Sequence, residues 1–143
     1  GKKCVVQGNC FPSAVMQDLA GFRSGAADVK VIICGGNDVD QGKDVQEIVE
    51  GFAATVDNHK ETSAVFACSV FNRKWSDGRN TELNVRTFHV NEILGLVAES
   101  MGVRMIEVWI QDDMFARDGL HLNERGKKYL AERIAERIGG FLG

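Results

Sequence analysis

The sequence is poor in the residues that build metal sites. It has three histidines, far apart at His59, His89 and His121, and four cysteines with no Cys-x-x-Cys pair among them. Because a zinc site gathers such ligands at short spacings, we expect no metal site. Cys34 and Cys68 stand in apolar runs, which predicts packed free thiols rather than disulfides or nucleophiles.

A strong charge and a long apolar run are also absent. The net charge is -3 and no basic stripe runs through the sequence, so we expect no direct nucleic-acid binding. No apolar run has the length of a membrane span and no signal peptide opens the chain. We therefore expect no membrane association and an intracellular, reducing setting. A length of 143 residues predicts one domain that spans residues 1–143.

Apolar, β-branched runs alternate with segments of helical periodicity, and proline occurs only at Pro12. Strands are expected at 4–6, 29–34, 63–71 and 103–109. Helices are expected at 14–22, 44–58 and 82–101 and after residue 123. Strict alternation of this kind predicts an α/β protein, a parallel sheet with helices on both faces in a three-layer α/β/α arrangement.

Helical periodicity predicts the buried face of each helix. In helix 44–58, which Asp44 is expected to cap, this face has Val45, Ile48, Val49, Phe52 and Val56. In helix 82–101 it has Val85, Phe88, Ile93, Leu96 and Val97. In the last helix, with Asn123 as the cap, it has Leu130, Ile134 and Ile138. Residues 72–80 are expected to form a polar surface loop, in which Arg73, Trp75 and Arg79 either line a substrate rim or are ordinary loop residues.

Two polar motifs follow predicted strands. A Gly-Gly-Asn-Asp turn comes after strand 29–34, and Asp118 and His121 lie in the loop after strand 103–109. Both motifs therefore belong to the carboxyl edge of the sheet, where ligands bind in parallel α/β folds. The spacing of Asp118 and His121 lets the carboxylate reach Nδ1 and leaves Nε2 as a general base. Each motif alone has a structural alternative, a simple turn or a helix cap beside a surface histidine.

Together and in this order, the motifs resemble the sequence blocks of the SGNH (GDSL-type) hydrolases, a flavodoxin-like family of esterases. Gly35-Gly36-Asn37-Asp38 is similar to the block G-x-N-D, whose Asn donates a hydrogen bond to an oxyanion. Asp118-x-x-His121 is similar to the block that supplies the acid and base of a Ser-His-Asp triad. Residues 11–19 resemble a third block, and Ser13 stands where that block has the glycine whose backbone N–H completes the oxyanion hole. The resemblance implies a small ester substrate and neither a metal nor an organic cofactor.

The nucleophile block of that family, Gly-Asp-Ser, does not occur in the sequence. Chain order aligns strand 4–6 with the second strand of the family, so the first strand, with its serine, is expected upstream of Gly1. The resemblance then implies a sheet of order 2-1-3-4-5 with a gap beside strand 29–34. Either the flanking strands pair directly, or another chain donates a strand, or the sequence is a piece of a longer protein. A homodimer or a strand-donating segment is therefore an expected partner.

Two functions stay open. One is a serine esterase whose serine lies outside this chain, with Ser13, an N-cap by default, as a remote replacement nucleophile. The other is a catalytically inactive binding or assembly module, since the overall sequence pattern is similar to that of SGNH-like domains in retrotransposon open reading frames. An enzyme needs Asp118, His121 and Asn37 to converge around an open cleft, whereas a module does not. A nucleotide-binding function is disfavoured because the sequence has no GxGxxG fingerprint.

Overall fold

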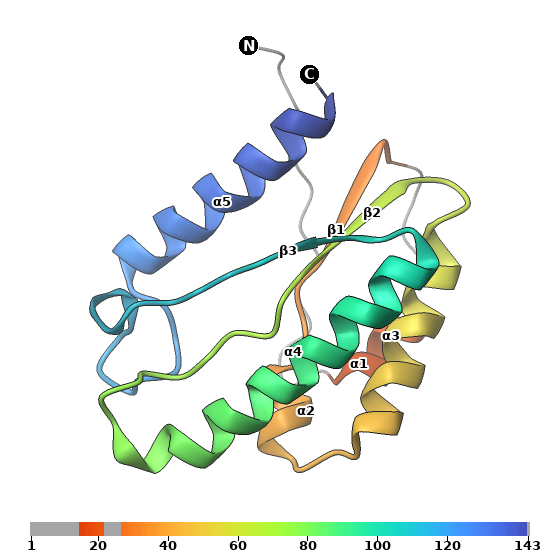
Figure 1. Ribbon diagram of the computed structural model, residues 1–143. Coiled ribbons are helices and arrows are strands. Elements are labelled where there is room, and N and C mark those ends of the chain that lie inside the picture. Colours follow the sequence, from red (N-terminus) through yellow and green to blue (C-terminus); the bar gives the residue numbers. More distant parts are fainter. Residues whose placement is uncertain (1–14, 22–26, 143) are drawn as a thin grey trace.

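The computed structural model describes residues 15–21 and 27–142 and shows an α/β fold (Figure 1). Its parallel strands lie in the order β1-β2-β3 and are Val29–Ile32 (β1), Ala64–Cys68 (β2) and Arg104–Ile106 (β3). The α-helices of the described residues are Met16–Ala20 (α1), Gly36–Asp40 (α2), Val45–His59 (α3), Thr81–Met101 (α4) and Glu124–Leu142 (α5). Two short 3-10 helices are Gly78–Asn80 (η1) and Asp112–Met114 (η2). The predicted parallel alternation is confirmed, and the predicted strand 4–6 lies outside the described residues.

Helices cover both faces of the sheet (Figure 1). The helices α1, α3 and α4 lie on one face and α5 lies on the other. Successive side chains of β2 point to opposite faces, so Val65 and Ala67 pack with α3 and α4, whereas Phe66 and Cys68 pack toward α5. This is the three-layer arrangement that the sequence predicts.

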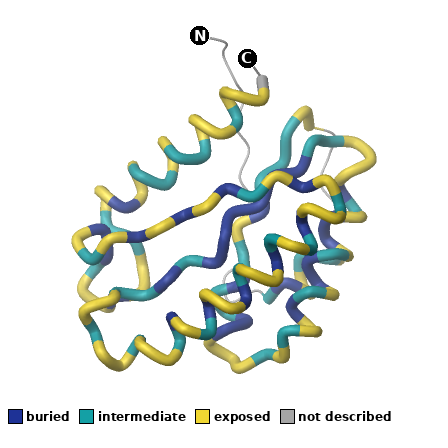
Figure 2. Tube along the Cα trace, viewed as in Figure 1, coloured by how far each residue is buried: buried dark blue, intermediate teal, exposed yellow. Residues whose placement is uncertain are grey.

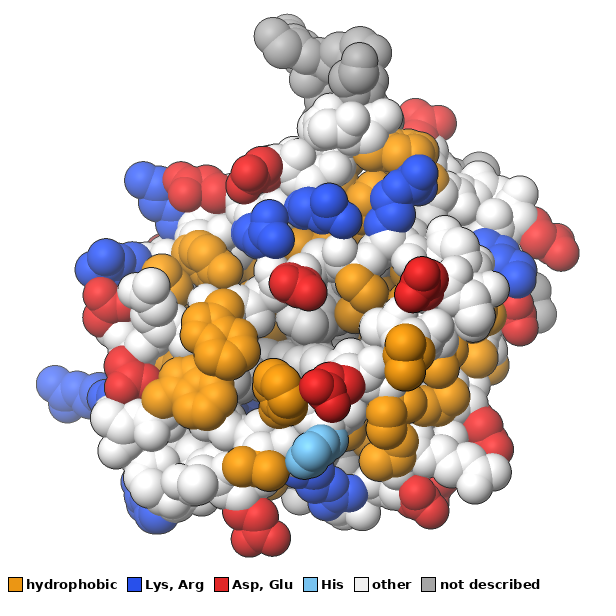
Figure 3. Space-filling view, viewed as in Figure 1, with side chains coloured by type: hydrophobic (Ala, Val, Ile, Leu, Met, Phe, Trp, Pro, Cys, Tyr) orange, Lys and Arg blue, Asp and Glu red, His pale blue; other side chains and the backbone are white. Residues whose placement is uncertain are grey.

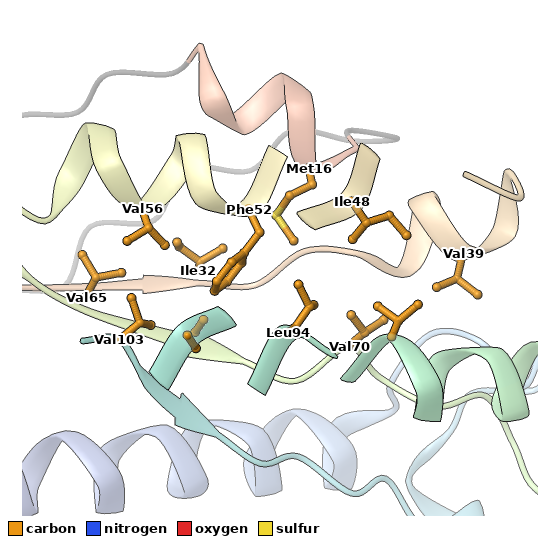
Figure 4. Packing of buried hydrophobic residues seen from close by; sticks show 13 residues of the cluster. Met16, Ile32, Val39, Ile48, Phe52, Val56, Val65, Val70, Leu94 and Val103 are labelled. Atoms are coloured by element: carbon orange, nitrogen blue, oxygen red, sulfur yellow. The ribbon is translucent and has the colours of Figure 1, made fainter. Parts of the chain in front are cut away.

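The larger core lies between the sheet and the helices α1, α3 and α4. Figure 4 shows Met16 of α1, Phe52 of α3 and Leu94 of α4 converging with Ile32 of β1, and all four are buried. Burying an aliphatic or aromatic side chain of this size contributes about 1.5–3 kcal/mol to the free energy of folding. The core therefore fixes the position of β1 and, with it, the turn that follows.

The starts of α3 and α5 have the predicted caps. The Asp44 carboxylate accepts a hydrogen bond from the Gln46 amide at 3.1 Å, and the Asn123 side-chain oxygen accepts one from the Gly126 amide at 2.9 Å. The predicted buried face of α3 is confirmed, with Ile48, Phe52 and Val56 buried. Leu130 and Ile134 of α5 pack on the sheet as partly buried residues.

The predicted buried face of α4 is wrong in four of its five residues. Val85, Phe88, Ile93 and Leu96 are exposed, and only Val97 packs against the core. The buried face instead contains Asn84, Thr87, Val90, Leu94 and Ala98. Figure 2 shows the outer side of α4 as an exposed stripe. Hydrophobic periodicity misplaces this face because two of its residues, Asn84 and Thr87, are polar and yet buried, and the Asn84 amide is bonded to the backbone of Arg73.

Paired strands are shorter than the apolar runs that predict them. β3 ends at Ile106 rather than at residue 109. Beyond Ile106, the backbone of the chain is hydrogen-bonded by side chains of the segment that follows β2. The Val108 amide donates to Ser69 Oγ at 2.9 Å, and the Ile110 amide donates to Asn72 Oδ1 at 3.1 Å. Asn72 is buried, so the prediction of a polar surface loop over residues 72–80 is wrong at its first residue.

Candidate active site

The loop after β3 brings Asp118 and His121 into direct contact. Their side chains meet with 2.5 Å between Nδ1 and Oδ2, as the spacing of the two residues predicts. The other carboxylate oxygen, Oδ1, accepts hydrogen bonds from the amides of Leu120 and His121, each at 2.9 Å. The imidazole side chain is 75% exposed, so Nδ1 is engaged while the ring remains open to solvent.

The electrostatics of this loop fix the direction of the hydrogen bond. The His121 side chain, followed by the two loop amides, lowers the pKa of Asp118 to about 2. The carboxylate is therefore ionised at neutral pH and can only accept, so Nδ1 carries the proton. In this tautomer the lone pair of the imidazole lies on Nε2.

The loop is held in place by its own short hairpin. Phe115 and Leu122 form an antiparallel bridge, and the Ala116 amide donates to the His121 carbonyl at 2.7 Å. Below it, the start of α5 packs tightly, because a Cβ at Gly126 would lie 2.4 Å from the Met114 carbonyl oxygen. The Asp118–His121 pair thus sits on a braced turn despite its exposure.

The turn after β1 is built around Gly35. This residue has a φ of 111° and is the N-cap of α2, and this helix replaces the simple turn that the sequence predicts. A Cβ at Gly35 would lie 2.5 Å from Cγ2 of Val70, so both the dihedral angle and the space require glycine. Gly36 and Asn37 form the first turn of α2 and are half-buried.

Asp38 ties α2 to α1. Its buried carboxylate accepts the Met16 amide with both oxygens, at 2.9 and 3.2 Å. Burial raises the pKa of this carboxyl, while the hydrogen bond from Met16 opposes the shift. Ser13, the predicted oxyanion-hole residue, lies outside the described residues.

Two consecutive residues after β2 connect the two motifs. The Arg73 guanidinium donates to Asp40 Oδ2 at 2.6 Å and to the Gly36 carbonyl at 3.4 Å, both in α2. The Lys74 amide donates to the carbonyl of Gly119, which lies between Asp118 and His121, at 3.0 Å. The carboxyl ends of all three strands are therefore linked at one edge, and Arg73 is a structural residue rather than an ordinary loop residue.

Cys34 lies beyond the end of β1 rather than inside the strand, in a half-buried position. Burial, followed by the charge of Asp38, raises the pKa of its thiol to about 11. The group is a protonated thiol at neutral pH, which agrees with a packing role and not with a nucleophile.

Sequence reasoning missed the amide side chains that organise this edge. Asn84 and Asn91 of α4 hold the backbone of Arg73 and Val70, and Asn72 holds that of Ile110. The one signal in the sequence is the spacing of Asn84 and Asn91, seven residues or two helical turns apart on one face.

Residues 15–21 and 27–142 contain no cluster of three or more histidine, cysteine or acidic side chains that could hold a metal ion. In the same part of the chain, no helix is long and apolar enough to cross a membrane.

No family model matches the sequence, and no curated protein matches it. Solved structures do match. A carbohydrate esterase family 3 protein from Talaromyces cellulolyticus aligns with a TM-score of 0.71 at 17% identity, over 90% of this chain and 68% of that one. An acetylxylan esterase from Geobacillus stearothermophilus gives 0.72 at 15% identity, over 89% and 68%. A G-D-S-L family lipolytic protein from Veillonella parvula gives 0.62 at 20% identity, over 85% and 69%.

This chain has the SGNH hydrolase fold. The sequence resemblance predicted this fold. Within the SGNH fold of this chain, Gly35–Asp38 follows β1 and the Asp118–His121 loop follows β3, both at the carboxyl edge. The retrotransposon subgroup stays a prediction.

Proposed function

We propose that this chain provides the histidine, the aspartate and an oxyanion donor of a serine ester hydrolase, with the serine supplied from outside its 143 residues. The observation that carries the proposal is the 2.5 Å contact between Asp118 and His121 on an exposed, braced loop at the carboxyl edge. An inactive module has no need of this contact, so the alternative gains no support from it.

The proposed reaction is the hydrolysis of a carboxylic ester, acyl or acetyl. The serine hydroxyl attacks the ester carbonyl, and Nε2 of His121 accepts its proton. Asp118 orients the imidazole and stabilises the imidazolium. His121 then returns the proton to the leaving alcohol, and water, activated by the same nitrogen, releases the acid.

Asn37 is proposed to stabilise the tetrahedral intermediate with its side-chain amide, together with the backbone N–H near Ser13. One such donor contributes about 3–4 kcal/mol to transition-state stabilisation. The links from Asp38 to α1 and from Arg73 to α2 support this role, because they hold the Asn37 turn from two sides.

The serine is proposed to arrive on a strand beside β1. Within the described residues, β1 pairs with β2 on one edge. A strand from a second chain, from a second copy or from a longer form of this protein would complete the sheet. Light scattering of the 143-residue chain tests this part, because a stable monomer that unfolds cooperatively contradicts a strand donated by a second copy.

The test of the whole proposal is a fluorophosphonate probe followed by intact-mass analysis. The 143-residue chain and the same chain within its full natural reading frame are labelled side by side. We expect a stoichiometric adduct on a serine outside residues 1–143, lost in His121→Ala and reduced in Asp118→Asn. An adduct on Ser13 would place the nucleophile inside the chain instead, and no adduct on either form contradicts the enzyme.

A further inference from the structure

Both tryptophans of the chain stand together on the surface. Trp75 follows β2 and Trp109 follows β3, and their rings stack with centroids 5.2 Å apart and 26° between the planes. Trp75 is 42% exposed and Trp109 is 57% exposed. Tryptophan usually buries most of its ring, so a stacked and exposed pair indicates a binding surface.

The pair forms one wall of a shallow pocket between α4 and the segments that follow β2 and β3. Phe88 of α4, itself 51% exposed, also lines this pocket. Figure 3 shows hydrophobic side chains gathered on this face, over α4 and the chain that follows β3. An amphipathic ligand with one flat apolar side fits such a surface.

The pocket is held in shape before any ligand binds. The Trp75 amide donates to Asp112 Oδ1 at 2.7 Å, and the neighbouring Ser76 amide donates to Oδ2 at 3.1 Å. The Trp109 amide donates to the Tyr129 hydroxyl at 3.2 Å. A main chain fixed in this way, with the two rings stacked on each other, loses little conformational entropy on binding, which favours a ligand of modest size.

The chemistry of the lining selects the class of ligand. Of the described residues that line the pocket, none is charged: they are three aromatic residues, three asparagines, two valines and a threonine. A phosphorylated or acidic ligand would lack a cation here. Asn91, which is half-buried, uses one N–H and one lone pair on Val70, and a carboxamide has two of each. A hydroxyl group can use the others.

An open, uncharged surface of aromatic rings beside one half-buried amide matches a sugar ring. The C–H face of a sugar can lie on the indoles while its hydroxyls meet the Asn91 amide and the solvent. A long alkyl chain needs a more enclosed groove, because most of its surface must leave water. We propose that Trp75 and Trp109 form the platform for a neutral saccharide ring.

The platform adjoins the candidate active site through the main chain of residues 74–76. Lys74 contacts Gly119 in the Asp118–His121 loop, and Asp112, which holds Trp75 and Ser76, begins the same connection. The saccharide is then the sugar part of a sugar ester, and this assignment rests on the proposed function. The proposal that a saccharide binds to the two tryptophans does not rest on the proposed function.

The tryptophan fluorescence of the chain tests the proposal directly, because both fluorophores are in the platform. Cellotriose and maltotriose are titrated into the wild-type chain in the millimolar range, with AMP and a short-chain detergent as comparison ligands. We expect a saturable change in emission with a trisaccharide and none with AMP. No saturable change with either sugar in a folded sample, or an equal response to AMP or detergent, overturns the proposal.

Variants locate the site by ligand-observed NMR, which needs no fluorophore. Trp75→Ala and Trp109→Ala should each weaken binding roughly tenfold, whereas Trp109→Phe should weaken it less. Val85→Ala, also exposed on α4 but outside the lining, is the matched control and should bind as the wild type does. Equal affinity in all four variants places the sugar elsewhere. Circular dichroism checks that each variant is folded.

The His121→Ala variant separates the two proposals. Trisaccharide binding that is retained in this variant while ester hydrolysis by the complete protein is lost supports both. Binding without any hydrolysis in the wild type contradicts only the proposed function. Hydrolysis without trisaccharide binding contradicts only the saccharide platform.

Discussion

Asn91 in α4 hydrogen-bonds both main-chain groups of Val70. The Val70 amide donates to Oδ1 at 2.7 Å, and Nδ2 donates to the Val70 carbonyl at 2.9 Å. Two helical turns earlier, Asn84 does the same for Arg73, at 2.7 and 3.0 Å. Side chains of α4 thus provide the backbone hydrogen bonds that a neighbouring strand would otherwise provide. They do so along the segment that links the two halves of the candidate site.

Replacement of Asn91 by leucine should destabilise the fold. Leucine preserves the bulk but leaves the amide and the carbonyl of Val70 without their partner, which costs about 1–3 kcal/mol for each buried group. Urea denaturation measures the change. Leu96→Ala, on the exposed side of the same helix, is the control and should stay within about 0.5 kcal/mol of the wild type. Equal stability of Asn91→Leu and the wild type contradicts the role given to the amide.

Two glycine-to-alanine substitutions should change the stability of the protein in opposite directions. Gly35→Ala forces a Cβ against Val70 at a φ of 111° and should destabilise the protein by about 2 kcal/mol or more. Gly95→Ala lies inside α4 with no neighbouring atom within 4 Å of the new Cβ and should stabilise it by about 0.5–1 kcal/mol. Thermal unfolding of the two variants checks both. A Gly35→Ala protein as stable as the wild type would show that the turn can relax.

The carboxyl of Asp118 should titrate near pH 2, and His121→Ala should raise its pKa toward the ordinary value, because the imidazole is the largest cause of the shift. Its pKa is lower in the folded state than in the unfolded chain. The stability that it contributes is therefore present above about pH 4 and is lost as the pH falls toward 2. Carbon-13 NMR of the side-chain carboxyl follows the titration in both proteins. An unchanged pKa in His121→Ala contradicts the contact.

The contribution of Asp38 to stability should change with pH in the direction opposite to that of Asp118. Burial raises its pKa above that of the unfolded chain, so the folded state binds the proton more tightly, and stability from this group is lost as the pH rises through the folded pKa. Asp38→Asn keeps an acceptor for the Met16 amide without a buried charge and should be close to neutral at pH 7. Asp38→Ala should cost about 1–3 kcal/mol. Urea denaturation across acidic and neutral pH distinguishes these outcomes, and a costly Asp38→Asn would show that the charge itself is needed.

Cys34 and Cys68 should react slowly with iodoacetamide. Burial raises the pKa of each thiol from 9.0 to about 11, so the thiolate fraction at pH 8 falls roughly a hundredfold. Peptide mapping after timed alkylation, with the urea-unfolded chain as reference, gives the rate at each site. A fast reaction at Cys34 in the folded chain would make it an activated thiol after all.

The parts of the structure that the sequence predicts are those set by local patterns. The caps at Asp44 and Asn123 and the buried face of α3 follow from residue types at fixed spacings, as does the contact of Asp118 with His121. Each depends on neighbours within about one turn of chain, where propensity and geometry act together.

The parts that fail depend on partners far along the chain. The buried face of α4 is partly polar because Asn84 hydrogen-bonds the backbone of Arg73, and the half-buried Asn91 does the same for Val70. No hydrophobic pattern can reveal these backbone partners. The pairing of Trp75 with Trp109 and the link from Arg73 to α2 join segments more than thirty residues apart. The oxyanion role of Ser13 and the source of the serine stay predictions.

Two adjacent residues, Arg73 and Lys74, connect the two motifs at the carboxyl edge of the sheet. Arg73 reaches one way to α2, and the amide of Lys74, the next residue, reaches the other way to Gly119. A small rotation of the backbone between these two residues would move Asn37 and His121 relative to each other. The relative position of the two motifs is thus governed by two adjacent residues that belong to neither of them.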